Sequence, residues 1–154
     1  MDNVINVYCD GGCRGNQNEE NVGSWGVYIT YKEKVIELGA YEINTTNNKM
    51  ELKACIEALK VIKKKNIKVN VYLDSAYVLN GIVSWVAGWK KNGWVNSSKK
   101  PVKNKELWVE LDKLKNEFTN INFIKVKGHS DNFGNIQADR ICNEYMDIYK
   151  SKNI

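Results

Sequence analysis

The sequence predicts a mixed α/β fold, in which one sheet of five strands carries helices on both faces. Three segments with strand patterns lie within the first 41 residues, and no helix pattern separates them. Helix and strand patterns then alternate up to the C-terminus. Strands in succession, followed by alternating helices and strands, are typical of a mixed sheet with helical crossovers.

Length and composition indicate one globular domain. The chain has 154 residues, of which 43% are hydrophobic and 27% charged, with a net charge of +5. We expect a single domain over residues 1–150 and a short tail over 151–154. The N-terminus has no basic lead followed by an apolar stretch, and no apolar run is long enough to cross a bilayer. We therefore expect a cytoplasmic protein.

The first strand pattern, Val4 to Tyr8, leads to Asp10, Gly11 and Gly12. Its β-branched and aromatic residues favour a buried central strand that ends at Asp10. The two glycines predict a turn, and they would also allow another backbone or a ligand to come close. An aspartate in this position is equally compatible with an ordinary solvated turn.

The remaining elements are predicted from hydrophobic periodicity and from residues that favour turns and helix ends. Alternation predicts a hairpin over 24–31 and 35–41, and residues 45–48 form a helix-start signal for a helix to about residue 65. A strand is expected over 69–73 and a helix from 75 to about 86. Residues 88–105 are expected to be irregular. The last elements are a helix over 105–117, a strand over 121–126 and a helix over 133–149.

The cysteines and the single histidine argue against zinc. The four cysteines form no C-x-x-C pair. Cys9, Cys55 and Cys142 lie in apolar patterns and are interpreted as small buried hydrophobes. Cys13 lies in a polar loop and has no obvious base partner, so catalysis there is disfavoured.

Four carboxylates form the candidate site: Asp10, Glu51, Asp74 and Asp139. Asp10 and Asp74 end predicted strands, where ligands bind in open α/β sheets. Asp139 falls on the apolar stripe of the last helix, and a carboxylate facing a core needs a partner or a metal. Mg²⁺ or Mn²⁺ suits such oxygen donors, and a pair of ions would support attack on a phosphodiester. Helix capping by Asp74 and a surface position for Glu51 remain open alternatives.

A basic, aromatic segment follows the third carboxylate. From Ser75 to Lys105 there is no acidic residue, and lysines interleave with tryptophans at Lys90, Lys91, Lys99, Lys100, Lys103, Lys105, Trp85, Trp89 and Trp94. Lysines neutralise phosphates, and aromatic rings pack on sugars or bases. This favours a nucleic-acid-binding protrusion over a solvated face.

Four motifs resemble, in order, those of type 1 ribonuclease H: Asp-Gly-Gly-Cys at 10–13, Thr-Thr-Asn-Asn-Lys-Met-Glu-Leu at 45–52, Leu-Asp-Ser-Ala-Tyr-Val at 73–78 and Val-Lys-Gly-His at 126–129. Residues 88–94 and 100–104 are similar to the basic protrusion of the bacterial form. The resemblance covers essentially the whole chain. It implies the ribonuclease H-like sheet and an endonuclease that hydrolyses the RNA strand of RNA–DNA hybrids, leaving 5′-phosphate and 3′-hydroxyl ends.

The resemblance also implies roles for individual residues. The four carboxylates would hold two Mg²⁺ ions, for which Mn²⁺ can substitute, with Asp10 bridging them. His129 would assist proton transfer or product departure, and its ordinary pKa suits that task. Asn16, Asn47 and Asn48 match positions that bind the RNA minor groove, where the 2′-OH distinguishes RNA from DNA. Thr46 and Asn104 match a pocket for a phosphate of the DNA strand, and Trp85 matches an aromatic residue of the DNA channel. Lys90 and Lys91, in the basic protrusion, would also bind the substrate.

Two departures from the family pattern concern affinity. Ala76 stands where larger residues that touch the substrate are common, and the loop 17–21 is unusually acidic. The expected partner is an RNA–DNA hybrid, without a membrane or an obligate protein partner, so we expect a monomer. Two alternatives stay open: a related metal nuclease acting on another nucleic acid, such as a DNA junction, and a non-catalytic hybrid-binding module.

Overall fold

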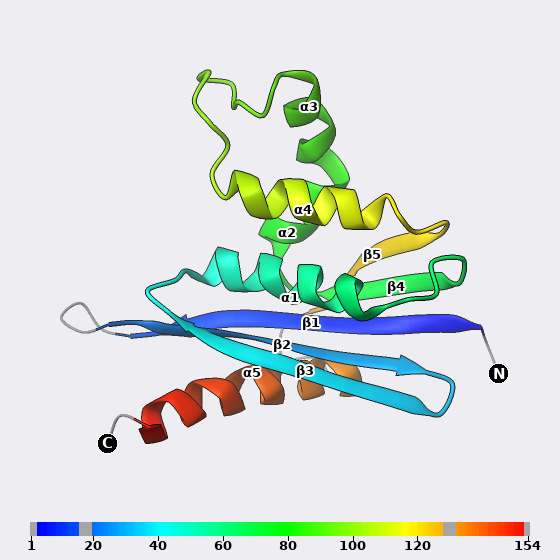
Figure 1. Ribbon diagram of the computed structural model, residues 1–154, viewed down its shortest axis with the longest axis vertical. Coiled ribbons are helices and arrows are strands. Elements are labelled where there is room, and N and C mark those ends of the chain that lie inside the picture. The colour runs from blue at the N-terminus through cyan, green and yellow to red at the C-terminus, as the bar shows by residue number, and fades with distance from the viewer. Residues whose placement is uncertain (1–2, 16–19, 128–131, 153–154) are drawn as a thin grey trace.

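The computed structural model describes residues 3–15, 20–127 and 132–152. Its centre is a five-stranded sheet with the order β3-β2-β1-β4-β5 (Figure 1). The strands are β1 (Val4–Arg14), β2 (Val22–Tyr31), β3 (Lys34–Ile43), β4 (Lys68–Leu73) and β5 (Ile121–Lys125). The predicted five-stranded mixed sheet is confirmed: β1, β2 and β3 pair antiparallel, whereas β4 and β5 join in parallel.

The first strand does not end at Asp10, which corrects the prediction from the sequence. Its parallel pairing with β4 stops at Cys9 opposite Leu73, but its antiparallel pairing with β2 continues to Arg14 opposite Val22. Asp10 therefore lies immediately beyond the last β1–β4 pair, although its own strand runs on. The long-range partner strand β2 decides this boundary, and the local Gly-Gly signal does not.

Gly11 does not form the predicted turn but allows close packing of a helix on β1. A Cβ atom at this position would lie 2.4 Å from the main-chain carbon of Met50 and 2.5 Å from the nitrogen of Glu51. The backbone of α1 (Asn47–Val61) thus packs directly on β1 at Gly11. The expected close approach of another backbone is confirmed, and it sets Glu51 beside Asp10.

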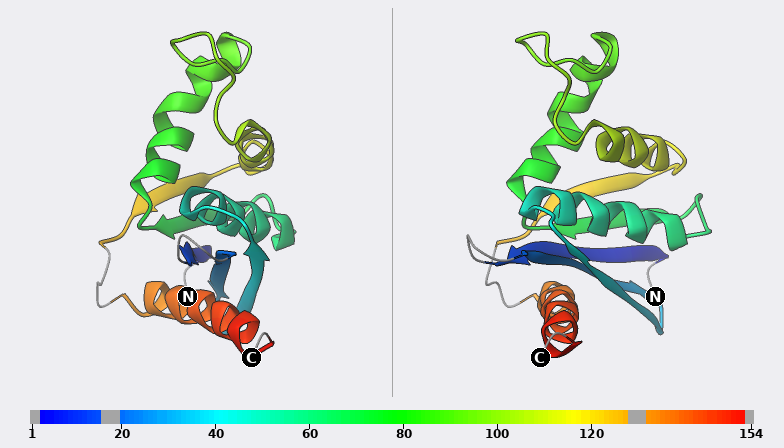
Figure 2. Two further views of the ribbon diagram at one scale, coloured as in Figure 1. Left: turned by 90° about the vertical axis from the view of Figure 1, so that its left-hand side faces the viewer. Right: turned by 60° about the vertical axis from the view of Figure 1, so that its left-hand side comes forward.

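Helices cover both faces of the sheet. Helices α1 and α4 (Lys105–Lys115) lie on one side, and α5 (Phe133–Lys152) crosses the other side under β1, β2 and β3 (Figures 1 and 2). Helix α1 ends at Val61, four residues earlier than predicted, whereas α5 continues into the segment predicted as a tail. No helix in the described part of the chain has the length and apolar character needed to cross a membrane.

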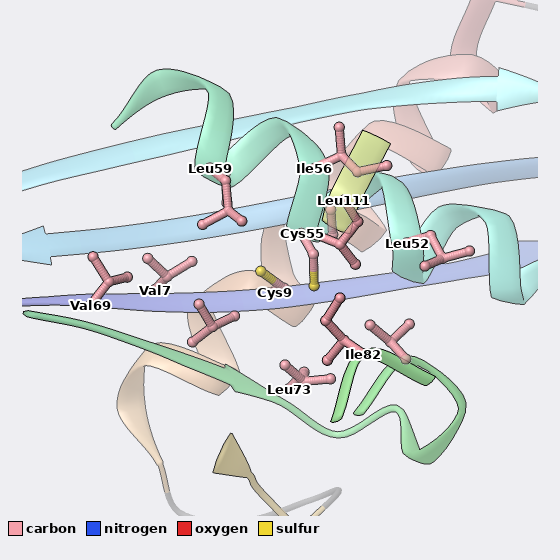
Figure 3. Close-up of a cluster of buried hydrophobic side chains, with 14 of the residues drawn as sticks. Val7, Cys9, Leu52, Cys55, Ile56, Leu59, Val69, Leu73, Ile82 and Leu111 are labelled. Carbon is pink, nitrogen blue, oxygen red and sulfur yellow. The ribbon is translucent and has the colours of Figure 1, made fainter. Parts of the chain in front are cut away.

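The main core lies between the sheet and α1. Thr46 caps α1 by accepting a hydrogen bond from the Lys49 N–H at 3.1 Å, and the helix then buries its predicted apolar stripe. Figure 3 shows this stripe facing the sheet, with Leu52, Cys55, Ile56 and Leu59 above Val7, Cys9, Val69 and Leu73. All four cysteines are free, and Cys9, Cys55 and Cys142 are buried as predicted.

Residues 76–104, here called the protrusion, rise away from the sheet (Figure 1). The chain passes through α2 (Ala76–Asn80), a π-helical turn η1 (Gly81–Trp85) and α3 (Val86–Lys91) before a loop returns it to α4. The helical path therefore extends five residues past the predicted end near 86. The rings of Trp89 and Trp108, 5.5 Å apart edge to face, hold these extra turns against α4.

Candidate active site

Three carboxylates from three elements meet at one edge of the sheet. Asp10 comes from β1, Glu51 from the second turn of α1 and Asp74 from the residue after β4. One carboxylate oxygen of each lies within 4.8 Å of the others. The β1–β4 register places the two aspartates side by side, and the contact at Gly11 brings in Glu51. The structure thus joins three of the four predicted carboxylates.

The main chain of Gly11 ties two of these carboxylates together. Its N–H lies 2.9 Å from Asp10 Oδ1 and 3.1 Å from Glu51 Oε1. A shared N–H donor stabilises the ionised carboxylates and fixes where their remaining oxygens point. Sequence reasoning singled out Gly11 for its freedom of conformation and missed this donor, which only the packing of α1 on β1 produces.

Asp139 reaches the cluster from the opposite face. It lies on α5, and its side chain hydrogen-bonds that of Asp10. The expectation that Asp139 lies on the buried stripe is wrong, because Ala138, Ile141 and Cys142 fill that stripe and Asp139 is exposed. It also stands outside the tight group formed by the other three carboxylates. Asp139 therefore lies at the solvent side of the site, in contact with Asp10.

The packing of like charges changes the acidity of the cluster. Burial, the hydrogen bond that the protonated Asp10 carboxyl donates to Asp139 and the nearby charge of Asp74 raise the pKa of Asp10 to about 8. Burial and the charges of Asp10 and Asp74 also raise the pKa of Glu51. Carboxylates held this close resist ionising together unless a cation balances them.

This donor set fits a hard divalent cation. The ligand atoms are carboxylate oxygens, which Mg²⁺ and Mn²⁺ prefer, and the described residues offer no thiolate or imidazole within the group. Burial and the neighbouring carboxylates raise the pKa of Asp10, and a bound cation would favour its ionised form. A metal site at this edge of the sheet accounts for both observations.

The start of α1 carries three of the predicted substrate-binding residues. Thr46 is the helix cap, and Asn47 and Asn48 are exposed in the first turn. The Oδ1 atom of Asn47 accepts a hydrogen bond from the Cys13 N–H at 2.7 Å, which joins the helix start to the end of β1. The amide NH₂ group of Asn47 remains available to donate to a ligand beside the carboxylates.

The start of α4 carries another predicted residue. Asn104 adopts a left-handed conformation with φ of 61° and donates from Nδ2 to the Tyr77 hydroxyl at 3.2 Å. Trp108 donates to the same hydroxyl from Nε1 at 3.1 Å. Tyr77 therefore fixes the α4 N-terminus against α2, a role that sequence reasoning missed. The position of Tyr77, three residues after Asp74, was the feature of the sequence that could have indicated this role.

The protrusion presents aromatic and basic groups as predicted. The Trp85 side chain is 40% exposed and packs on Tyr77 and Trp89, with ring centroids 5.9 Å away in both cases. A cleft of about 710 Å³ lies beside it, bounded by Trp85, Gly88, Trp89, Asn92, Val95, Asn96, Ser97 and Lys99. The predicted lysines of this region are all exposed.

Lys90 differs from the other lysines of the protrusion. Its ammonium lies 2.9 Å from Asp112 Oδ2, on a side chain that is only 10% exposed. It therefore links α3 to α4 besides standing on the basic surface, whereas Lys91 is exposed without an ion pair in the described part of the protein. Two predicted residues, Asn16 and His129, lie outside the described residues.

Comparisons with known proteins point in one direction. The family model described as RNase H matches residues 2–146. The chain is 48% identical over 150 residues to a protein named ribonuclease H from Clostridium botulinum (strain Hall), covering 97% of this chain and 99% of that one. A ribonuclease H from Ruthia magnifica is 46% identical over 145 residues, covering 94% and 97% of the two chains.

Solved structures agree with the sequence matches. LC9-RNase H1, described as a type 1 RNase H with the type 2 active-site motif, superposes with a TM-score of 0.77 at 29% identity, covering 94% of this chain and 72% of that one. LC11-RNase H1 in complex with an RNA/DNA hybrid gives a TM-score of 0.71 at 27% identity, covering 94% and 98%. Both likenesses extend over nearly the whole of the present chain.

Proposed function

The chain belongs to the ribonuclease H family, and we propose that it cleaves the RNA strand of RNA–DNA hybrids with two bound Mg²⁺ ions, leaving 5′-phosphate and 3′-hydroxyl ends. Family membership makes the chain an endoribonuclease. The observation that carries the finer proposal is the group of Asp10, Glu51 and Asp74, whose oxygens lie within 4.8 Å of one another. A binding module without catalysis would have no use for such a costly arrangement.

Each carboxylate has a defined part in this proposal. Asp10, which lies beside Glu51 and Asp74 and also contacts Asp139, would be shared between the two ions. Glu51 and Asp74 would hold one ion, and Asp139 would complete the ligands of the other. Bound Mg²⁺ supplies positive charge that lowers the pKa of an attacking water and stabilises the leaving oxygen.

The protein's own groups orient these ligands. The Gly11 N–H holds one oxygen each of Asp10 and Glu51, so their other oxygens are presented to the site. The main chain on both sides is rigid, because β1 is paired with β2 and β4 and α1 packs on it. Oxygens fixed in this way lose little freedom when a ligand binds.

Recognition of the two strands would come from two helix starts. Asn47 and Asn48 would donate to and accept from the 2′-hydroxyls of RNA, which DNA lacks. Thr46 and Asn104 would bind a phosphate of the DNA strand. The N-termini of α1 and α4 lie at the same side of the molecule in Figure 1, which supports a shared phosphate site.

Other substrate contacts belong to the protrusion and the loops. Trp85 would pack on a sugar of the DNA strand, and Lys90 and Lys91 would neutralise phosphates. We also propose that His129 moves a proton during product formation and that Asn16 contributes to the RNA minor groove. These last two roles rest on the sequence resemblance.

A cleavage assay on three duplexes tests the proposal. Labelled RNA–DNA hybrid, RNA duplex and DNA duplex of one sequence are incubated with the protein, with Mg²⁺, with Mn²⁺ and with EDTA. We expect cleavage of the RNA strand of the hybrid alone, only with metal, and ligation-competent 5′-phosphate ends. Cleavage of a DNA duplex or junction would support the rival nuclease instead, and cleavage in EDTA would refute the metal site.

A further inference from the structure

An exposed lysine on β5 stands at the edge of the carboxylate site. The sheet register pairs Lys125 with Leu73, the residue before Asp74. The Lys125 ammonium donates a hydrogen bond to the main-chain carbonyl oxygen of Asp74. No carboxylate of the described residues lies within ion-pair distance of this ammonium. A positive charge is therefore held at the main chain of a proposed metal ligand without forming an ion pair with its carboxylate.

The groups around Lys125 are already engaged. Asp74 contributes its carboxylate to the site, and Ser75 Oγ caps α2 by accepting the Val78 N–H at 3.1 Å. The Tyr77 hydroxyl accepts from Asn104 and Trp108. An ammonium has three donors, and the carbonyl of Asp74 takes one of them. Lys125 thus keeps two donors for a ligand at this edge.

Ala76 leaves the ammonium open. It is the first residue of α2, it is exposed, and its methyl group has no polar atom to occupy Lys125. Figure 2 shows the end of β5 beside the lower end of α2, and the two elements are in contact.

We propose that Lys125 binds a backbone phosphate of the RNA strand next to the bond that is cut, and so takes the place of a longer side chain at position 76. This inference rests on the proposed function. A cluster of carboxylates repels the sugar–phosphate backbone, and a fixed cation beside it offsets that repulsion where the strand must enter. The carbonyl of Asp74 holds the ammonium there before the substrate arrives.

The test compares Lys125→Met with Lys125→Arg and with Lys68→Met. Methionine keeps the length of the side chain and removes the charge, whereas arginine keeps the charge. Lys68 is an exposed lysine at the opposite end of β4 and controls for net charge. Binding of a fluorescein-labelled RNA–DNA hybrid is followed by anisotropy in EDTA over a series of KCl concentrations, and cleavage is measured separately in Mg²⁺.

We expect Lys125→Met to raise the Kd about fivefold, equivalent to about 1 kcal/mol, and to raise KM with little change in kcat. The slope of log K against log salt should flatten by roughly 0.7–0.9, the amount for one phosphate. Lys125→Arg should keep the wild-type slope, and Lys68→Met should change it less than Lys125→Met does.

Two results would overturn the inference. An unchanged salt slope in Lys125→Met would show that no phosphate is bound there, even if thermal stability fell. Equal changes in Lys125→Met and Lys68→Met would reduce the effect to net charge. Wild-type protein that failed to cleave the hybrid would instead defeat the proposed function, so the two failures are distinguishable.

Discussion

The carboxylate site and the protrusion are held in place by different kinds of contact. In the site, Asp10 lies on β1, Asp74 directly follows β4, and Glu51 lies on a helix that touches β1 at Gly11. In the protrusion, exposed lysines stand on short helices and a loop, held by rings such as Trp89 on Trp108. Position is fixed by backbone contact in the first region and by side-chain packing in the second.

This difference separates chemistry from binding. Reaction requires oxygens held within fractions of an ångström, so a small displacement at the site is costly. Phosphate binding by lysines depends mainly on charge and tolerates mobile side chains. Changes in the site should therefore act on kcat in large steps, and changes in the protrusion should act on KM and on salt dependence in small ones.

Asp10→Asn should have the largest effect. It removes one negative charge from the cluster with little change in volume. We expect single-turnover cleavage in Mg²⁺ to fall by roughly 10³-fold or more, as for the loss of a central electrostatic group. The far-UV circular dichroism spectrum serves as the control for folding. Activity close to wild type would contradict the two-metal assignment.

We also expect Asp10→Asn to be more thermally stable than the wild type, by an amount that depends on pH. The pKa of Asp10 is raised from 3.8 to about 8 in the folded protein, so the folded state disfavours its ionised form. Stability linked to this group is fully present below about pH 4 and is lost as the pH rises towards 8. In EDTA, the Tm of Asp10→Asn should exceed that of wild type by a margin that grows across this range. A margin that shrinks towards pH 8 would contradict the burial of the charge.

His129→Ala should have the next largest effect on turnover. Proton transfer by a positioned side chain contributes about 10²–10⁴-fold, and water can replace a shuttle, so we expect a loss of about 10²-fold or less. Single-turnover and steady-state rates near neutral pH separate chemistry from product release. Unchanged rates in both would make His129 an ordinary surface residue.

A pair of glycine substitutions sharpens the contrast between the regions. A Cβ at Gly11 would lie 2.4 Å from the main chain of Met50, whereas at Gly88 in α3 it would meet nothing within 4 Å. Gly11→Ala should lower the free energy of unfolding by about 1–3 kcal/mol and reduce kcat, since Glu51 must shift. Gly88→Ala should raise it by about 0.5–1 kcal/mol. Urea unfolding measures both, and equal effects would remove the contrast.

The sequence predicted most of the fold because its strands and its first helix carry strong local patterns. The apolar period of α1 and the cap at Thr46 are local, and both are confirmed. The end of β1 was wrong because pairing with β2, up to Arg14 opposite Val22, overrides the local glycines. The predicted helix end near residue 86 was wrong because hydrophobic periodicity along the chain cannot show that Trp89 packs on Trp108.

The site shows the same limit at the level of single residues. The meeting of Asp10, Glu51 and Asp74 could be predicted from the sequence, because the order of strands in the sheet brings these parts of the chain to one edge. The exposure of Asp139 could not be predicted, because an error of one residue in placing the apolar stripe of a helix turns a side chain by about 100°. The ion pair of Lys90 with Asp112 joins separate elements and leaves no pattern in the sequence.

Replacing lysines of the protrusion should have the smallest effect on rate. Replacing Lys91, Lys99 and Lys100 together with Ala should leave kcat at saturation nearly unchanged, because the phosphates that we propose they bind lie away from the scissile bond. Each phosphate that the variant no longer neutralises should flatten the slope of log K against log salt by roughly 0.7–0.9, so KM should rise most at high salt. An unchanged slope would remove the protrusion from the binding surface and leave the carboxylate site intact.

Adding Lys90→Ala separates binding from architecture within the protrusion. Its removal leaves Asp112, whose side chain is 10% exposed, without its cation, so we expect a decrease of about 1 kcal/mol in unfolding free energy that the other three replacements do not cause. Asp112→Asn in the same background should recover part of that decrease, because no unpaired charge then remains. If Lys90→Ala flattened the salt slope without any decrease in stability, its ammonium would serve the nucleic acid alone, and the link between α3 and α4 would depend on the aromatic rings.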